Sequence, residues 1–296
     1  MSDHFQCGYV ALIGKPNTGK STLMNALVGE KLSITAHRPQ TTRHQILGIK
    51  TTSNYQCIFV DTPGIHKDQK KAINRYMNRA ATSMLKDVDL ICVLIDARQL
   101  DQDDEMILQR LQDADNVILV LNKMDLVPRQ ALLPMMQRLG RLLPTAEIIP
   151  VSALKQENLE SLMQHIQQRL PEGIPHFADD QLTDKPMRFI VAEIIREKLF
   201  RMLTQELPYS ITVNVEHYKI EQDMTRISAS IWVERKSQKG IVIGKGGVML
   251  KKIGSEARKD IEHLTGHKVF LQLWVKVRED WSDDERSLAA FGYSSE

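Results

Sequence analysis

A glycine-rich octapeptide places the tightest constraint on the fold of this 296-residue chain. It has the pattern Gly-x-x-x-x-Gly-Lys-Ser, follows the apolar run Tyr9–Ile13 directly and opens an amphipathic stretch, Ser21–Val28. Glycines let backbone N–H groups surround a phosphate, and a helix N-terminus adds a favourable dipole. We therefore expect a strand, a phosphate-binding loop and a helix, with a ligand-free glycine turn as the alternative. The predicted loop residues are Gly14, Lys15, Pro16, Asn17, Thr18, Gly19, Lys20 and Ser21.

Two side chains of this loop indicate its chemistry. Lys20 is expected to reach the β- and γ-phosphates of a nucleotide, and the hydroxyl of Ser21 is expected to coordinate Mg²⁺. Kinases, ATPases and GTPases share this pattern, so the loop alone leaves the nucleotide open.

Short apolar runs alternate with amphipathic stretches from Tyr9 to about Leu170. This alternation predicts an α/β domain, with a mostly parallel sheet and helices on both faces. The expected strands are Tyr9–Ile13, Gln56–Val60, Leu90–Ile95, Asn116–Leu121 and Glu147–Val151. The expected helices are Ser21–Val28, Ala72–Lys86, Glu105–Asp113 and Asn158–Arg169.

The alternation stops at a segment with three prolines, which continue neither a helix nor a central strand. The elements beyond it are grouped differently and predict a smaller α+β domain. They are a helix at Phe189–Leu207, strands at Ser210–Glu221 and Thr225–Glu234, a helix at Val248–Thr265 and a strand at Lys268–Val277. We expect a nucleotide-binding domain at 1–172, a linker at 173–187, a second domain at 188–280 and a tail at 281–296 with one short helix.

Composition excludes several classes of protein. Lys and Arg number 39 against 37 Asp and Glu, but residues 185–280 hold 18 basic and 12 acidic residues, which favours a polyanion as the partner of the second domain. No apolar run is long enough to span a bilayer, and the N-terminus lacks the pattern of a signal peptide. Cys7, Cys57 and Cys92 read as buried free thiols in a reducing, cytoplasmic compartment.

The sequence Asn122-Lys123-Met124-Asp125 ends the strand Asn116–Leu121, where a nucleotide base would lie. A carboxylate at Asp125 would accept both N–H groups on the Watson–Crick edge of guanine, whereas adenine presents an acceptor there. Ser152 and Ala153 end the next strand, where a backbone N–H could meet guanine O6. The sequence therefore predicts a guanine nucleotide.

A metal site is expected where Asp61-Thr62-Pro63-Gly64 follows the strand that ends at Val60. Asp61 would hold Mg²⁺ through water, and the N–H of Gly64 would sense the γ-phosphate. In the polar stretch from Arg38 to His44, Thr42 is predicted to bind Mg²⁺, with Thr41 as the alternative. The stretch could instead be a solvated loop without a ligand.

A second glycine-rich loop, Gly244-Lys245-Gly246-Gly247, precedes the helix Val248–Thr265. It matches the Gly-x-x-Gly loop with which KH domains approach a nucleic-acid backbone. We expect RNA contacts at Gly244, Lys245, Gly246, Gly247 and Lys251. Ile241, Ile243, Val248 and Ile253 are candidates for an apolar groove floor or, alternatively, for ordinary core residues.

Residues 8 to 170 resemble the GTPases of the Era and TrmE group. Together with a type II KH arrangement and the stretches Gln40–His44, Leu207–Ser210 and Leu273–Val277, the chain resembles the Era family over nearly its whole length. The resemblance implies a slow, Mg²⁺-dependent GTP-hydrolysing switch in which Lys20, Thr42 and Asn17 are catalytic. Ile65 stands where Ras-like enzymes carry a water-positioning glutamine.

The resemblance also implies partners. These are 16S ribosomal RNA near its 3′ end and the 30S subunit, in whose assembly the family acts. The resemblance further implies a peripheral pool of the protein at the inner membrane. A monomer without a DNA partner is expected. Asn17 resembles the asparagine that helps to hold K⁺ in related GTPases, with a local turn hydrogen bond as the alternative. Two rival functions stay open: an RNA-binding protein with a merely structural GTP site, and a membrane-surface GTPase.

Overall fold

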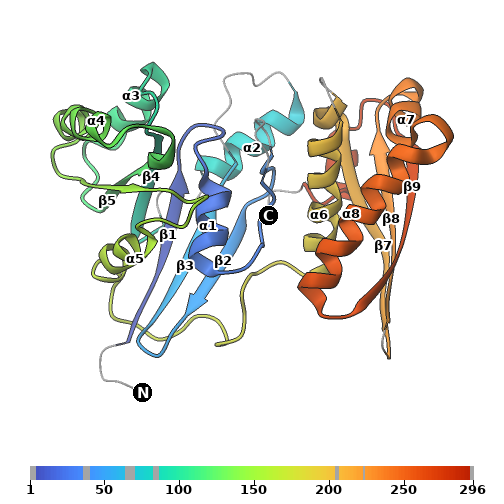
Figure 1. The fold of residues 1–296 in the computed structure, drawn as a ribbon, viewed down its shortest axis with the longest axis horizontal. Coiled ribbons are helices and arrows are strands. Elements are labelled where there is room, and N and C mark those ends of the chain that lie inside the picture. The colour runs from blue at the N-terminus through green and yellow to red at the C-terminus, as the bar shows by residue number, and fades with distance from the viewer. Residues whose placement is uncertain are drawn as a thin grey trace. The chain divides into compact units, whose positions relative to one another are not determined.

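A computed structural model of the chain describes residues 5–35, 41–63, 71–82, 87–203, 207–222 and 224–293, without the side chains of residues 78–82. Figure 1 gives its elements. The structure forms two compact units, of which the second begins at Lys185 and also includes Ile34, Thr35, Thr41 and the beginning of α2 (Ala72–Thr82). Each unit is described separately.

The first unit is built on a six-stranded sheet with the order β2-β3-β1-β4-β5-β6. All neighbouring pairs are parallel except β2 and β3, which form an antiparallel pair at one edge. The strands are β1 (Gln6–Ile13), β2 (Ile46–Thr51), β3 (Tyr55–Asp61), β4 (Leu90–Asp96), β5 (Val117–Asn122) and β6 (Glu147–Val151). The helices that accompany it are α1 (Lys20–Val28), α3 (Gln102–Gln109), α4 (Arg129–Leu142) and α5 (Leu159–Gln167).

Helices cover both faces of this sheet. Ala11 and Ile13 of β1 share one apolar cluster with Leu108 of α3 and Leu139 of α4. Leu12 points to the opposite face of the pleat and is equally buried, because α1 packs over β1, β2 and β3, and α5 packs against α1 and β6. The predicted α/β fold with a mostly parallel sheet is therefore confirmed.

The segment expected as a linker runs along the first unit as far as Asp184. The carboxylate of Asp184 accepts a hydrogen bond from the backbone of Leu47, and the carbonyl of Leu182 accepts one from Ile49. The side chain of Gln56 binds the backbone of Phe177. The contacts of Leu47 and Ile49 line the edge strand β2, and that of Gln56 lies on β3. The sequence did not predict β2.

The second unit contains a three-stranded sheet in the order β7-β8-β9, with β7 antiparallel and β9 parallel to β8. In chain order the elements are α6 (Met187–Met202), β7 (Ile211–Glu221), β8 (Met224–Val233), α7 (Lys236–Ile243), α8 (Val248–Thr265), β9 (Lys268–Val277) and α9 (Glu285–Ala290). This α-β-β-α-α-β order confirms the predicted smaller α+β domain.

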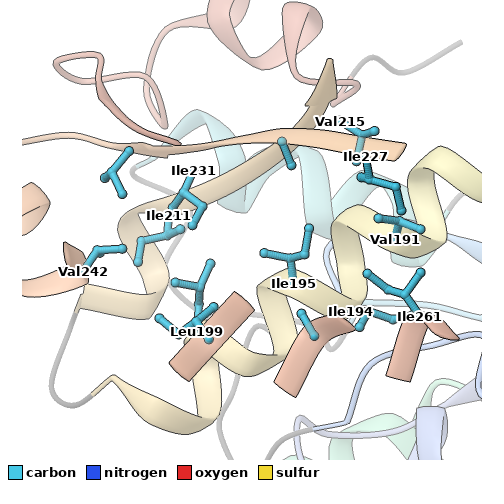
Figure 2. Packing of buried hydrophobic residues seen from close by; sticks show 14 of the residues in the cluster. Val191, Ile194, Ile195, Leu199, Ile211, Val215, Ile227, Ile231, Val242 and Ile261 are labelled. Atoms are coloured by element: carbon cyan, nitrogen blue, oxygen red, sulfur yellow. The ribbon is translucent and has the colours of Figure 1, made fainter. Parts of the chain in front are cut away.

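One helix of this unit corrects the sequence analysis. The sequence predicted no helix between the strand Thr225–Glu234 and the glycine turn, but Lys236–Ile243 forms α7, and Val242 is its buried residue. Figure 2 shows the core that fixes this arrangement: Ile195 and Leu199 of α6 face Ile211 and Ile231 of the sheet. The three cysteines are buried and unpaired, as expected.

Candidate nucleotide-binding and RNA-binding sites

The phosphate-binding loop connects β1 to α1 and requires glycine at both ends. Gly14 has φ +145° and Gly19 has φ +102°, in the region that other residues rarely adopt. A Cβ at Gly14 would lie 2.5 Å from the carbonyl oxygen of Leu94, and one at Gly19 would lie 2.3 Å from the amide nitrogen of Asn122. The loop therefore packs directly against the ends of neighbouring strands.

Lys20 is held inside this loop. Its Nζ donates hydrogen bonds of 2.9 Å to the carbonyl oxygens of Gly14 and of Lys15. Burial lowers the pKa of Lys20 to about 8, and the nearby charge of Asp61 opposes this shift only in part. Pro16 and Thr18 complete the loop, with the hydroxyl of Thr18 donating to the carbonyl of Lys15.

Three hydroxyls converge on one carboxylate at the end of β3. Asp61 Oδ2 accepts hydrogen bonds of 2.6 Å from Ser21, 2.7 Å from Ser33 and 3.5 Å from Thr42. Ser21 and Thr42 also lie 2.7 Å apart. Burial raises the pKa of Asp61, although the hydrogen bonds from Ser21 and Ser33 oppose this.

This oxygen cluster fits Mg²⁺. The second oxygen, Asp61 Oδ1, is buried and has no hydrogen-bond partner among the residues that the structure describes, so it is free to bind a ligand. Mg²⁺ in nucleotide sites binds through one or two protein oxygens together with phosphate oxygens and water. The structure brings Thr42 to this cluster, whereas the carbonyl of Thr41 accepts a hydrogen bond from Arg196.

The predicted guanine-binding residues meet at the ends of β5 and β6. Asn122 Nδ2 donates to the carbonyl of Thr18 at 2.8 Å, and Asn122 Oδ1 accepts from the backbone of Ala153 at 3.0 Å. Asp125 Oδ1 accepts a 2.6 Å hydrogen bond from Ser152 Oγ. Asn122 thus links the phosphate-binding loop to the base-binding loops through hydrogen bonds. The backbone N–H of Ala153, which the sequence predicts as a donor to guanine O6, donates here to Asn122 Oδ1.

The remaining predicted residues lie close by. Thr62 donates its hydroxyl to the carbonyl of Leu12, Pro63 follows it, and Met124 begins a short 3₁₀ turn after Lys123. Gly64 and Ile65 lie outside the residues that the structure describes.

Several acidic residues of the site were not found from the sequence. Asp96, the last residue of β4, accepts a 2.7 Å hydrogen bond from Lys123 Nζ, which also donates to the carbonyl of Asn17 at 2.6 Å. Lys15 forms ion pairs of 2.6 Å with Asp101 and 2.7 Å with Asp104, at the beginning of α3. The sequence held one indication of such residues, the position of Asp96 directly at the end of an apolar strand, because polar residues at the carboxyl ends of parallel strands lie together at one edge of the sheet.

The second glycine loop lies between α7 and α8. Gly244, Gly246 and Gly247 have φ of +73°, +62° and +80°, and a Cβ at Gly246 or Gly247 would meet nothing within 4 Å. Lys245 and Lys251 are exposed beside it. The loop therefore leaves its backbone open to a close approach.

A groove of about 510 Å³ runs beside this loop, between α8 and β9. Its lining consists of Gly247, Leu250, Lys251, Gly254, Ser255, Arg258, Val269, Phe270, Leu271 and Leu273. Of the candidate floor residues, Ile253 is fully buried in the core and does not line the groove, while Ile241 and Val248 are more than half exposed.

A phosphate-binding loop between β1 and α1, with polar residues at the ends of β3, β5 and β6, places the first unit in the class of P-loop GTPases. The second unit has the architecture of a type II KH domain. Comparison agrees with both: the family described as 50S ribosome-binding GTPase matches residues 9–123, and the KH domain family matches residues 206–282.

Whole-chain relatives identify the family. GTPase Era of Azotobacter vinelandii is 50% identical over 97% of both chains, and that of Pseudomonas putida is 50% identical over 99% of this chain and 98% of its own. A crystal structure of Era in complex with MgGDPNP and nucleotides 1506–1542 of 16S ribosomal RNA is 41% identical, covers 99% of this chain and 100% of its own, and has a TM-score of 0.94. A point variant of Era from Aquifex aeolicus bound to GDP·AlF4⁻ also has a TM-score of 0.94, at 40% identity and 98% and 100% coverage. The chain belongs to the Era family of GTPases.

None of the helices in the described ranges combines the length and apolar character that crossing a membrane requires.

Proposed function

We propose that this protein is a GTP-driven switch that binds 16S ribosomal RNA near its 3′ end and acts in assembly and maturation of the 30S subunit. The observation that carries the proposal is the presence of both a GTPase site and an open KH groove in one chain. It is supported by a relative, similar over the whole chain, that was crystallised with MgGDPNP and nucleotides 1506–1542 of 16S ribosomal RNA.

In the nucleotide site, we assign the phosphates to the loop Gly14–Ser21 and to Thr62, Pro63 and Gly64. Guanine is assigned to Asn122, Lys123, Met124, Asp125, Ser152 and Ala153. Lys20 would neutralise charge on the β- and γ-phosphates, because burial lowers its pKa and a phosphate beside it would favour the charged form. Ser21, Thr42 and Asp61 would hold Mg²⁺, which neutralises phosphate charge when bound.

These residues position and neutralise the phosphates. No side chain in the described part of this site is placed as a general base, which fits phosphoryl transfer, where catalysis is mainly positioning and electrostatic stabilisation. Thr42 directly follows Thr41, whose carbonyl accepts a hydrogen bond from Arg196. Contacts of Thr42 at the γ-phosphate would therefore also restrain the position of Thr41. Hydrolysis would release that restraint.

For RNA, we assign the backbone to Gly244, Lys245, Gly246 and Gly247, with Lys251 as a phosphate contact. The exposed glycine backbone and the N-terminus of α8 favour phosphate. The groove beside them would receive bases against Leu250 and Leu273.

We further propose that K⁺ activates hydrolysis through Asn17. Two observations support the proposal: Asn17 is exposed with φ +65°, and its backbone carbonyl accepts a hydrogen bond from Lys123 Nζ, which restrains the backbone at this position. The expected result is faster hydrolysis in KCl than in NaCl, lost in Asn17→Ala. Equal rates in the two salts would contradict K⁺ activation and leave Asn17 as a turn residue.

Domain limits and location also enter as proposals. We assign the GTPase domain to 1–172, the linker to 173–187, the KH domain to 188–280 and the tail to 281–296. A cytoplasmic location is supported by the three free, buried cysteines, and a peripheral membrane pool by the family resemblance. Fractionation of cells with and without a salt wash tests both.

The test of the RNA site compares Gly246→Asp with Gly246→Asn. Both side chains tolerate positive φ and meet open space, so only the added charge differs. We expect Gly246→Asp to weaken binding of 16S nucleotides 1506–1542 much more than Gly246→Asn, with unassisted GTP hydrolysis unchanged in both. Equal binding by both variants and by the unaltered protein would contradict the assignment of the groove.

A further inference from the structure

A serine outside the predicted site residues holds the carboxylate of Asp61. Ser33 Oγ donates a 2.7 Å hydrogen bond to Asp61 Oδ2, and Ser33 is only 1% exposed. The other two donors to this oxygen are Ser21 and Thr42, both assigned above to Mg²⁺. Ser33 is therefore the one of these three hydroxyls to which neither a motif nor the metal assignment gives a role.

Ser33 is fixed to helix α1 by a side-chain amide. Asn25 Oδ1 accepts hydrogen bonds from the backbone N–H groups of Leu32 at 3.0 Å and of Ser33 at 2.9 Å. Asn25 Nδ2 donates to the carbonyl oxygen of Ser33 at 2.7 Å. Both backbone polar groups of Ser33 are thus bound by one side chain, so the position from which its hydroxyl reaches Asp61 is set within the protein itself.

The way α1 ends explains this arrangement. The helix stops at Gly29, whose φ of +96° lies in the left-handed region and whose N–H donates to the carbonyl of Asn25. A left-handed glycine at a helix end lets the chain leave the helix axis, and here Leu32 and Ser33 return to the side chain of Asn25. Because Ser21 and Asn25 are four residues apart, they lie on the same face of α1. This face contacts Asp61 directly through Ser21 and indirectly through Ser33.

All three hydroxyls bind the same oxygen of the carboxylate. Asp61 Oδ2 receives them, whereas Oδ1 is buried and has no hydrogen-bond partner in the part of the chain that the structure describes. The terminal torsion of an aspartate side chain has only a broad intrinsic preference, so hydrogen bonds decide where its oxygens point. A donor that fixes Oδ2 therefore also fixes the direction of Oδ1.

We propose that Ser33 is a further positioning residue of the Mg²⁺ site, which holds Asp61 Oδ2 so that Oδ1 remains available to the metal ion, and that Asn25 supports it. The inference rests on the proposed assignment of Mg²⁺ to Ser21, Thr42 and Asp61. Partners that orient the groups around a metal ion typically contribute 10–100-fold to metal affinity. Since Asp61 is expected to hold Mg²⁺ through water, we expect a smaller contribution of at least about fivefold.

The test measures release of a fluorescent GDP from the full chain over a series of Mg²⁺ concentrations, with a metal chelator as the zero point. Ser33→Ala should raise the Mg²⁺ concentration that slows release by half at least about fivefold. The release rates in chelator and at saturating Mg²⁺ should both stay within twofold of those of the unaltered protein, because the nucleotide contacts are intact and excess metal restores the site. Loss of a merely structural hydroxyl would not shift the Mg²⁺ requirement alone.

Two further variants make the comparison specific. Thr52→Ala is the matched control: its hydroxyl accepts two backbone hydrogen bonds in the turn before β3 and does not contact Asp61, so the Mg²⁺ requirement should stay within twofold. Asn25→Asp keeps the acceptor oxygen and the Ser33 hydroxyl but loses the donor to the carbonyl of Ser33, and should raise the Mg²⁺ requirement at least twofold. Thermal unfolding establishes that each variant is folded, and Asn25→Asp decides the question if Ser33→Ala does not fold.

The outcomes separate this inference from the metal site itself. A Mg²⁺ requirement of Ser33→Ala no higher than that of Thr52→Ala would overturn the positioning role, and so would an equal acceleration of release with and without Mg²⁺. If Ser33→Ala does not fold, an unchanged Mg²⁺ requirement of Asn25→Asp would overturn it. If GDP release from the unaltered protein does not depend on Mg²⁺, the proposed Mg²⁺ site fails, and this inference fails with it.

Discussion

Replacing Asp96 with asparagine tests how the base-binding loop is held. The carboxylate of Asp96 accepts hydrogen bonds from Lys123 at 2.7 Å and, in a two-point pair, from Arg98 at 2.9 and 2.6 Å. Burial raises the pKa of Asp96, but the hydrogen bonds from Arg98 and Lys123 more than offset this, so the group is ionised near neutral pH. Asp96→Asn keeps the shape of the side chain and removes its charge.

The expected magnitude follows from exposure. A hydrogen bond to a charged group contributes about 1.5–3 kcal/mol, and the 22% exposure of the Lys123 side chain screens part of it. Lys123 keeps its bond to the carbonyl of Asn17. We therefore expect a loss of about 1–2 kcal/mol, which corresponds to roughly 5–30-fold weaker GTP and GDP binding.

The assay is titration with a fluorescent guanine nucleotide, together with the hydrolysis rate at saturation. The contacts of Asp96 are with Lys123 and Arg98 beside the predicted base-binding loop, so the rate at saturating GTP should be unchanged within about twofold. Arg98→Ala is the matched control: it removes the other partner of the same carboxylate, a side chain that is 52% exposed, and should weaken binding by less than about fivefold. The reasoning is wrong if Arg98→Ala weakens nucleotide binding more than Asp96→Asn does.

Three further predictions follow from the same geometry. Burial lowers the pKa of Lys20 to about 8, so the folded chain binds fewer protons than the unfolded chain between about pH 8 and 10.5, and its stability should rise with pH in this range. For the same reason, GTP binding at pH 8.5 should be accompanied by uptake of a proton. Calorimetry in two buffers measures this uptake, and zero uptake would contradict the buried lysine. Gly19→Ala should lower GTP affinity at least tenfold, because its Cβ would displace the side chain of Asn122, and a nucleotide titration within twofold of the unaltered protein would refute this. Ile253→Ala should destabilise the chain by about 2–5 kcal/mol in denaturant unfolding while Val248→Ala costs less than about 0.5 kcal/mol, and the reverse order would mean that Ile253 is not core.

Sequence analysis predicted the fold class because its strongest patterns are local. A phosphate-binding loop needs glycine at fixed positions, and a buried parallel strand is a continuous apolar run, as in Leu90–Ile95. Both signals survive in a single sequence, so five of the six strands in the first sheet were anticipated.

The elements that were missed have ambiguous patterns. β2 contains Gly48 and follows a polar segment, so its short alternation does not predict a strand. A Cβ at Gly48 would lie 2.8 Å from the side chain of Met24, so the glycine makes room for Met24. α7 ends in Ile241–Ile243, an apolar run whose period fits a strand as well as a helix. α4 contains Pro134, which normally argues against a helix interior.

The nucleotide site illustrates the same limit. Lys20, Ser21, Thr42 and Asp61 were assigned from position along the chain. The structure brings the oxygens of Ser21, Thr42 and Asp61 together and holds Lys20 Nζ inside the phosphate-binding loop. Asp104 was not assigned, because its pairing with Lys15 joins loops that only the folded sheet makes adjacent. Asp104 is almost fully buried, and no local pattern distinguishes it from Asp103 and Glu105, the partly exposed acidic residues of the same helix.

Crosslinking of the protein to RNA in cells, followed by sequencing, tests the central claim most directly. The account predicts that reads accumulate near the 3′ end of 16S ribosomal RNA, that Gly246→Asp removes them, and that Gly246→Asn retains most of them. Scattered reads that neither substitution changes would contradict the assignment of the KH groove and of the ribosomal partner.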